Sequence, residues 1–180
     1  MYGLEKLAEL ISERNRISKA ISNLIGRPAL PRHIGEYIAS KIFYIELEKS
    51  ATSKGIDGRF TERPLKEKTV NIKLYGKREG FLDISLGNLA DYYLVLTGPK
   101  SEPTSSRGTS RPLVISNVYL FNMEELLKEL RRRKVKIGIA TSVASRYWKE
   151  AEIYPGNMNR EISITEWQTN QLRLFSPSRN

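Results

Sequence analysis

The sequence predicts an α/β fold in which a mixed central β-sheet is flanked by helices. Three observations lead to this prediction. Apolar residues recur every three or four positions in residues 3–48, which is the period of amphipathic helices. Over residues 59–97 the period changes to two and ends in the apolar run YYLVLT, typical of a strand buried on both faces. A helical period returns after residue 122.

The first two elements are predicted to be helices. Residues 3–25 place leucines and isoleucines at mainly three- and four-residue steps, and Gly26 and Pro28 end this helix. Such a helix either packs into the core or builds a homodimer. A second helix is expected from Ile34 to Glu48, with four isoleucines on one face.

The middle of the chain supplies the sheet. Residues 100–111 are polar and cationic and are expected to form a loop. Asn122 is expected to cap a helix over 123–133, where acids come early and arginines late, as the helix dipole favours. A short helix is also allowed between the second and third strands. The strands are expected at 59–62, 68–76, 92–97, 112–121 and 135–141. Residues 68–76 and 91–98 are expected to be adjacent strands of the sheet.

The chain is expected to form a single domain over residues 1–180. A further helix is predicted at 145–153, and the tail from Pro155 is predicted to be irregular, with Trp167 and Leu172 docking back. The predicted parts are an N-terminal helix and linker, a core and a C-terminal extension, at 1–29, 30–140 and 141–180.

Composition narrows the partners and the chemistry. The net charge is +10 and the sequence pI is near 9.8, which favours an anionic partner, nucleic acid foremost. The absence of cysteine excludes disulfides and thiolate chemistry, and the single histidine, His33, excludes a multi-histidine metal site. No Gly-rich phosphate loop and no Ser-His-Asp arrangement is recognisable. No run approaches the ~18 apolar residues of a membrane span, so we expect no membrane partner and a cytoplasmic location.

The strand at 68–76 carries polar residues where a site could form. Val70 and Ile72 are expected to point into the core, while Asn71 and Lys73 point to the other face. If a hairpin brings Asp57 to the start of that face, Asp57, Asn71 and Lys73 converge. Glu36, in the first turn of the preceding helix, adds a second carboxylate.

These side chains can serve a hard divalent cation. Asp57, Glu36, the Asn71 amide oxygen and the backbone carbonyl of Ile72 are oxygen ligands of the kind that Mg²⁺ or Mn²⁺ takes. Beside such an ion, Lys73 can orient or deprotonate an attacking water, or offset charge on a phosphate.

The order of these motifs resembles the PD-(D/E)XK, restriction-endonuclease-like superfamily. The resemblance rests on GEYIA on a helix, then GID, then a strand with NIK, then the apolar strand YYLVLT, and it covers roughly residues 30–140. It implies a restriction-endonuclease-like core with an extra N-terminal helix, and a Mg²⁺-dependent nuclease that hydrolyses phosphodiester bonds. Carried over, Glu36 is the helix acid, Asp57 the central metal ligand and Lys73 the lysine of the motif.

Asn71 departs from that superfamily, because it stands where the second acid usually is. Removing one negative ligand lowers affinity for a hard cation. Three alternatives stay open. Another acid, with Glu62 or Glu67 nearest, takes the place; the site works with fewer charges; or catalysis is lost and only nucleic-acid binding remains.

The basic residues suit a nucleic-acid partner, more readily DNA, since phosphate contacts need only a density of cations. The residues assigned to this surface are Lys66, Lys68, Lys77, Arg78, Lys100, Arg107 and Arg111, with a second cluster at Arg131, Arg132, Arg133, Lys134 and Lys136.

Less specific interpretations remain for the same residues. Asp57 can hold a turn, Glu36 can serve a helix N-terminus, and Asn71 with Lys73 can form the wet face of an edge strand. Two other classes of protein therefore stay open: a nucleic-acid-binding module without catalysis, and a basic scaffold that binds a protein.

Overall fold

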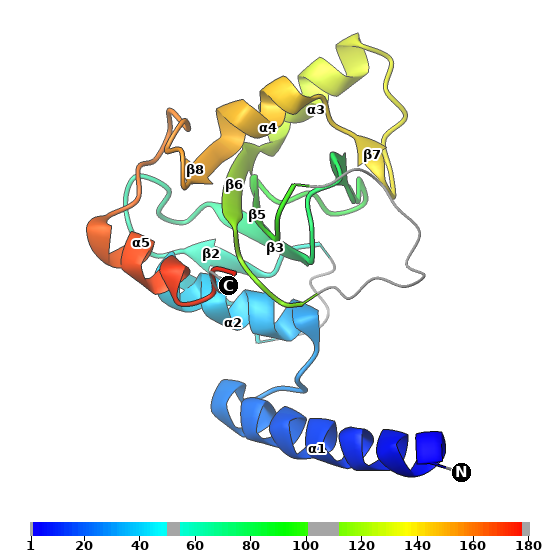
Figure 1. The fold of residues 1–180 in the computed structure, drawn as a ribbon. Helices are drawn as coiled ribbons and strands as arrows, with labels where there is room; N and C mark the ends of the chain where they lie inside the picture. Colours follow the sequence, from blue (N-terminus) through cyan, green and yellow to red (C-terminus); the bar gives the residue numbers. More distant parts are fainter. Residues whose placement is uncertain (1, 50–54, 101–111, 178–180) are drawn as a thin grey trace.

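The computed structural model describes residues 2–49, 55–100 and 112–177. Its centre is a six-stranded mixed sheet with helices on both faces (Figure 1), which confirms the predicted α/β class. In spatial order the strands are β1 (Ile45–Leu47), β2 (Gly58–Phe60), β3 (Thr69–Tyr75), β5 (Tyr92–Thr97), β6 (Asn117–Asn122) and β8 (Glu152–Tyr154). Two short strands, β4 (Phe81–Leu82) and β7 (Thr141–Ser142), pair separately.

Each face of the sheet has its own hydrophobic core. One face packs against α2 (Pro31–Ile42) and α5 (Glu166–Arg173), and the other against α3 (Met123–Arg132) and α4 (Ser145–Ala151) (Figure 1). Strand alternation explains the division. The first core contains Val70, Ile72, Leu94 and Leu96, whereas the second contains Tyr93, Val95, Tyr119 and Phe121.

Helix α1 (Tyr2–Ile25) stands apart from this body and is joined to α2 by a short connector (Figure 1). The helix predicted at 3–25 is therefore confirmed. Gly26 follows it with a left-handed φ of 71°, a conformation that glycine adopts at helix ends without steric cost. Across the described ranges, no helix combines the length and the apolarity needed to cross a membrane.

Strands β3 and β5 are neighbours, as predicted, and they pair in parallel from Val70 opposite Tyr92 to Tyr75 opposite Thr97. Strand β2 lies on the other side of β3 and is antiparallel to it. Asn71 is only 9% exposed and Lys73 is half-buried, so the interpretation of these two residues as the wet face of an edge strand is wrong.

The second helix ends earlier than predicted. It stops at Ile42 instead of Glu48, and residues 45–47 form β1. Tyr44 has a φ of 53°, which breaks the helix. Ile42 in the helix and Ile45 in the strand are both buried and three residues apart, so the apolar period continues across the break.

Other boundaries shift for local reasons. The strand predicted at 135–141 reduces to Thr141–Ser142, because Lys134 and Ala140 have φ values of 56° and 55° and Ile139 is 91% exposed. No helix lies between β3 and β5, where β4 is found instead. The strands predicted at 59–62 and 112–121 are observed at 58–60 and 117–122.

The C-terminal residues complete the sheet and the core. Residues 152–153, predicted as the end of a helix, belong to β8, which pairs with β6. The tail is not irregular, since it contains α5, whose start is fixed by a capping box between Thr165 and Gln168. Leu172 is fully buried, as predicted, and Trp167 stacks on Tyr44 with ring centroids 6.1 Å apart.

A glycine sets the spacing between α2 and the sheet. A Cβ atom at Gly35 would lie 2.8 Å from the Cβ of Leu74, so α2 packs closely on β3 only because this side chain is absent. The next residue is Glu36, and the same contact therefore positions the carboxylate that the sequence singles out.

We predict that Gly35→Val lowers the free energy of unfolding by about 1–3 kcal/mol, because the added atoms force α2 away from β3. Gly87 is the control, since a Cβ there meets nothing within 4 Å, and Gly87→Val is expected to change stability by less than about 0.5 kcal/mol. Urea unfolding measures both values. Equal stability of the two variants would contradict the close packing.

Candidate functional site

The candidate site forms where β2 stops pairing with β3. The backbone N–H of Asp57 donates to the carbonyl oxygen of Val70 at 2.8 Å. Its carboxylate then turns to β3, where Oδ2 accepts from the N–H of Ile72 at 2.7 Å. The side chain of Asp57 thus takes the position that a continuing β2 backbone would occupy, and it is only 7% exposed.

The backbone of Ile72 faces the carboxylate of Asp57. In a regular strand the N–H and C=O of one residue point to the same neighbouring strand. Because the N–H of Ile72 points to Asp57, its carbonyl oxygen points to the same edge of β3. The side chain of Ile72 meanwhile packs in the core with α2.

Glu36 reaches the site from α2 and is 2% exposed. A buried carboxylate needs charge partners, and Glu36 has two. Arg27 from the connector pairs with Oε2, and Arg32, one turn earlier on α2, donates to Oε1 at 2.6 Å. Arg32 also donates to Oδ1 of Asp57 at 3.2 Å. The guanidinium of Arg32 therefore bridges the two carboxylates.

Asn71 lies on the opposite face of β3 and is 9% exposed. Its amide nitrogen donates to the carbonyl oxygen of Gly55 at 3.1 Å. Its side-chain oxygen is buried and has no hydrogen-bond partner among the described residues. Buried acceptors are rarely left unpaired, so a structural role alone does not account for this oxygen.

Lys73 follows Asn71 on the same face, as predicted from strand alternation. Its ammonium lies 5.0 Å from the centre of the Tyr93 ring, a cation–π contact. Burial lowers the pKa of Lys73, against the attraction of the Asp83 and Asp57 carboxylates. Burial also raises the pKa of Asp57, against the hydrogen bond from Ile72 and the attraction of Arg32 and Lys73. Glu36 adds to that rise.

The structure thus brings Glu36 and Lys73 each within electrostatic reach of Asp57, with Asn71 two residues before Lys73 on the same face of β3. It does not bring in Glu62 or Glu67. Both are exposed in the turn at the far end of the β2–β3 hairpin. Glu67 pairs with Phe60, three residues beyond Asp57, or about 10 Å along the strand.

Two charged residues of the site, Arg32 and Asp83, were not predicted from the sequence. The sequence does indicate Arg32, since this residue precedes Glu36 by four positions and therefore shares its helix face. Asp83 has no such local indication, because it follows Lys73 by ten residues in an irregular segment. It is held by two hydrogen bonds, in which its N–H donates to the Tyr75 hydroxyl at 3.2 Å and its Oδ1 accepts from the N–H of Ala140 at 2.8 Å.

The donor atoms fit a hard cation in part. Over the described ranges, no group of three or more histidines, aspartates or glutamates is arranged to hold a metal. The set that remains is one carboxylate from Asp57, the unpaired amide oxygen of Asn71 and the carbonyl of Ile72. All are oxygens, which suits Mg²⁺ or Mn²⁺, although the charge of the set is lower than that of a two-carboxylate site.

The predicted nucleic-acid residues lie at both ends of β3. Lys66 and Lys68 are exposed in the turn before it. After it, Lys77 is 15% exposed and pairs with Glu79 at 3.0 Å, and Arg78 packs over the rings of Tyr119 and Trp148.

The other predicted cations divide by position. Lys100 is exposed, and its backbone forms an isolated parallel β-bridge with that of Arg78. Arg107 and Arg111 fall outside the described residues. The second cluster begins in the last turn of α3, continues beyond its end and is exposed, with Arg132 paired to Glu129 at 2.7 Å.

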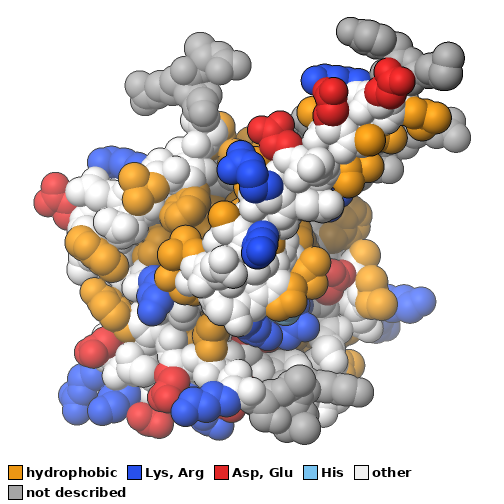
Figure 2. Space-filling model, turned by 90° about the horizontal axis from the view of Figure 1, so that it is seen from below, with side chains coloured by type: hydrophobic (Ala, Val, Ile, Leu, Met, Phe, Trp, Pro, Cys, Tyr) orange, Lys and Arg blue, Asp and Glu red, His pale blue; other side chains and the backbone are white. Residues whose placement is uncertain are grey.

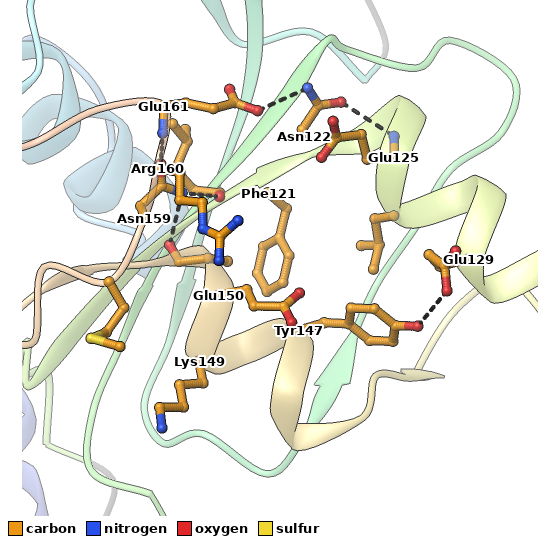
Figure 3. A pocket seen from close by; sticks show the side chains of 14 residues that line it. Phe121, Asn122, Glu125, Glu129, Tyr147, Lys149, Glu150, Asn159, Arg160 and Glu161 are labelled. Carbon is orange, nitrogen blue, oxygen red and sulfur yellow. Dashed lines mark hydrogen bonds between the residues drawn. The ribbon is translucent and has the colours of Figure 1, made fainter.

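A hollow of about 750 Å³ lies elsewhere, between α3, α4 and the segment after β8 (Figure 3). Phe121 forms its apolar floor, and the Tyr147 hydroxyl donates to Glu129 at 2.9 Å on one side. Acids outnumber bases around it, since it is lined by Glu125, Glu129, Glu150 and Glu161 against Lys149 and Arg160. An acidic lining disfavours phosphate, so this hollow is not the candidate nucleic-acid site.

Comparisons with known proteins do not assign the chain to a family. Neither the models of protein families nor the curated proteins give a match.

We predict that Asp57→Asn stabilises the fold at neutral pH. The folded-state pKa of Asp57 lies above its ordinary value of 3.8, so the stability it contributes is present below pH 3.8 and is lost as pH rises through the folded-state pKa. Asparagine keeps the shape and removes the buried charge. The melting temperature should rise by about 2–4 °C per kcal/mol gained, and the gain should shrink in acid.

Asp91→Asn is the matched control. Burial works to raise the pKa of Asp91, but hydrogen bonds from Thr69 outweigh it and lower the pKa. This substitution should therefore destabilise the fold at neutral pH. Calorimetric melts across a pH series compare the two variants, and a destabilised Asp57→Asn at neutral pH would show that the Arg32 ion pair outweighs burial.

Proposed function

We propose that the chain is a metal-dependent phosphodiesterase that acts on nucleic acid, as its resemblance to PD-(D/E)XK nucleases implies. One observation carries the proposal. The carboxylate of Asp57 lies against the backbone of Ile72 at the point where β2 leaves β3, with a half-buried lysine next along the strand and a buried helix acid behind it. This geometry supports the proposal.

The residues of the chain would divide the work as follows. Asp57, the Asn71 amide oxygen and the Ile72 carbonyl would hold the cation, and Glu36 would support Asp57 through Arg32. The cation would supply Lewis-acid stabilisation of the phosphate and an acidified water. Lys73 would orient the water or accept its proton, and its lowered pKa increases the neutral fraction available near neutral pH.

The substrate class follows from charge. A net charge of +10 favours a polyanion, and Lys66 and Lys68 are exposed at one end of the strand that carries Asn71 and Lys73. We propose DNA as the first substrate to test, with the cytoplasm as the place where it is met.

A second candidate function is nucleic-acid binding without cleavage. Two observations favour it. Arg27 and Arg32 together neutralise Glu36 and Asp57, which reduces the attraction of these carboxylates for a cation. Asn71 is neutral where a second acid would add charge. In this alternative the same surface binds phosphates and the buried carboxylates only hold Arg32 in place.

Cleavage assays with Mg²⁺ or Mn²⁺ on duplex DNA, single-stranded DNA and RNA test the proposal. We predict that the wild type cleaves at least one of them, and that Asp57→Asn abolishes cleavage while binding is retained, since no positive charge is removed. Lys73→Met should lower turnover by about 10²–10⁴-fold. Lys149→Gln, beside the acidic hollow, should retain activity.

Asn71→Asp separates the two candidate functions, because it adds a carboxylate of the same shape. A nuclease with a weakened metal site should bind Mn²⁺ more tightly and cleave faster after this change. If the wild type and Asn71→Asp both fail to cleave and both fail to bind Mn²⁺ by calorimetry, the nuclease proposal is wrong and binding without cleavage replaces it.

Nucleic-acid binding should be steeply salt-dependent. The logarithm of the association constant should fall with the logarithm of salt concentration by roughly 0.9 per neutralised phosphate. Lys68→Gln should reduce that slope by about one, whereas Lys149→Gln, beside the acidic hollow, should leave it unchanged. Fluorescence anisotropy measures the slopes, and a flat response would favour a protein-binding scaffold.

A further inference from the structure

Helix α1 exposes an apolar face that the rest of the chain does not cover. Six large apolar side chains on it are 46–75% exposed, namely Leu4, Leu7, Leu10, Ile11, Ile17 and Leu24. Figure 2 shows the helix projecting beyond the body with hydrophobic side chains uncovered along it. Partly buried side chains occur only in its last eight residues, at Ser18, Ile21, Ser22 and Ile25.

A helix in this position needs a partner. Isolated helices are marginally stable in water, and most helices owe their stability to packing of an apolar face. At 24 residues α1 is about 36 Å long, and an apolar stripe of that length on the surface usually marks an interaction site.

The spacing of the apolar residues is symmetric about Arg14. Leu4 and Leu24 lie ten positions from it, Leu7 and Ile21 seven, and Ile11 and Ile17 three. A two-fold interface requires that residue i contact residue j of the second copy, and residue j contact residue i. An antiparallel pair of α1 helices crossing at Arg14 meets this requirement for these three pairs, whereas Leu10 then faces Ser18.

The charges of α1 are also complementary in that orientation. Its first half carries Glu5, Glu9 and Glu13, with Lys6 paired to Glu9 at 3.1 Å, and its second half carries Arg14, Arg16 and Lys19. An antiparallel pair sets the acidic half of each copy alongside the basic half of the other and opposes the helix dipoles favourably. Because Glu5, Glu9, Arg16 and Lys19 share the helix face of Ser12, this is a long-range attraction and not a set of direct ion pairs. A parallel pair would set like charges together.

We propose that α1 binds the α1 helix of a second copy of this chain, antiparallel and centred on Arg14. The two Arg14 side chains then meet at the two-fold axis. In each copy Glu13 directly precedes Arg14 in the sequence. A polar residue at the centre of a helical interface fixes its register and lowers its affinity. The proposal does not depend on the proposed nuclease activity.

The full chain lacks cysteine, so single cysteines report the orientation directly. Under mild oxidation Arg14→Cys should form a covalent dimer. Leu4→Cys alone should not, because the two copies of residue 4 would lie about 30 Å apart. A mixture of Leu4→Cys and Leu24→Cys should cross-link. Self-linkage of Leu4→Cys with no linkage of the mixture would overturn the antiparallel arrangement.

Light scattering and sedimentation of the cysteine-free chain test association itself. The wild type should be a dimer, Leu7→Glu should raise the dissociation constant at least 100-fold, and Arg14→Leu should lower it at least tenfold. Ser12→Glu, on the opposite face, should leave it unchanged, and circular dichroism confirms that each variant is folded. A wild type that stays monomeric at 100 µM, or whose α1 binds lipid vesicles as a monomer, would overturn the proposal.

Discussion

The candidate site depends on one hydrogen bond, from the backbone N–H of Ile72 to the carboxylate of Asp57. At that point β2 no longer provides a backbone partner for β3, and the side chain of Asp57 replaces it. The replacement satisfies a buried donor and places a carboxylate at the edge of an interior strand. In a regular strand the carbonyl oxygen of Ile72 points to the same edge of β3 as its N–H. A local solution to an unpaired strand thus creates the geometry of a candidate cation site.

The charges around Asp57 are balanced by arginines and a lysine. Glu36 is almost wholly buried and is held by Arg27 and Arg32, and Arg32 extends to Asp57. Pairing of this kind is required for buried carboxylates. It has a chemical consequence, because a cation entering at Asp57 must compete with the guanidinium of Arg32. Asn71 contributes no charge to that competition, and its buried, unpaired oxygen is the feature that a purely structural role does not explain.

The sequence predicted those parts of the molecule that are governed by short-range patterns. Strand alternation identified the shared face of Asn71 and Lys73, and capping chemistry identified the start of α3 at Asn122. The β3–β5 pairing also followed from pattern and length. By contrast, Tyr44 and Ala140 adopt left-handed φ values that no period reveals, and these residues ended α2 early and shortened a strand. Asp83 reaches the site only through the fold, so no local signal could identify it. Thr165 and Gln168 have the spacing of a capping box, so the start of α5 is predictable from the sequence.

The central claim is that Asp57, Asn71 and the Ile72 carbonyl form a cation site on β3. Crystals of the wild-type chain soaked in Mn²⁺ and measured at a wavelength where manganese scatters anomalously test it most directly. The account predicts one anomalous peak about 2.0–2.6 Å from Asp57 and from the Ile72 carbonyl oxygen, absent in Asp57→Asn. Soaked crystals with no peak there, and with Arg32 still bound to Asp57, would contradict it.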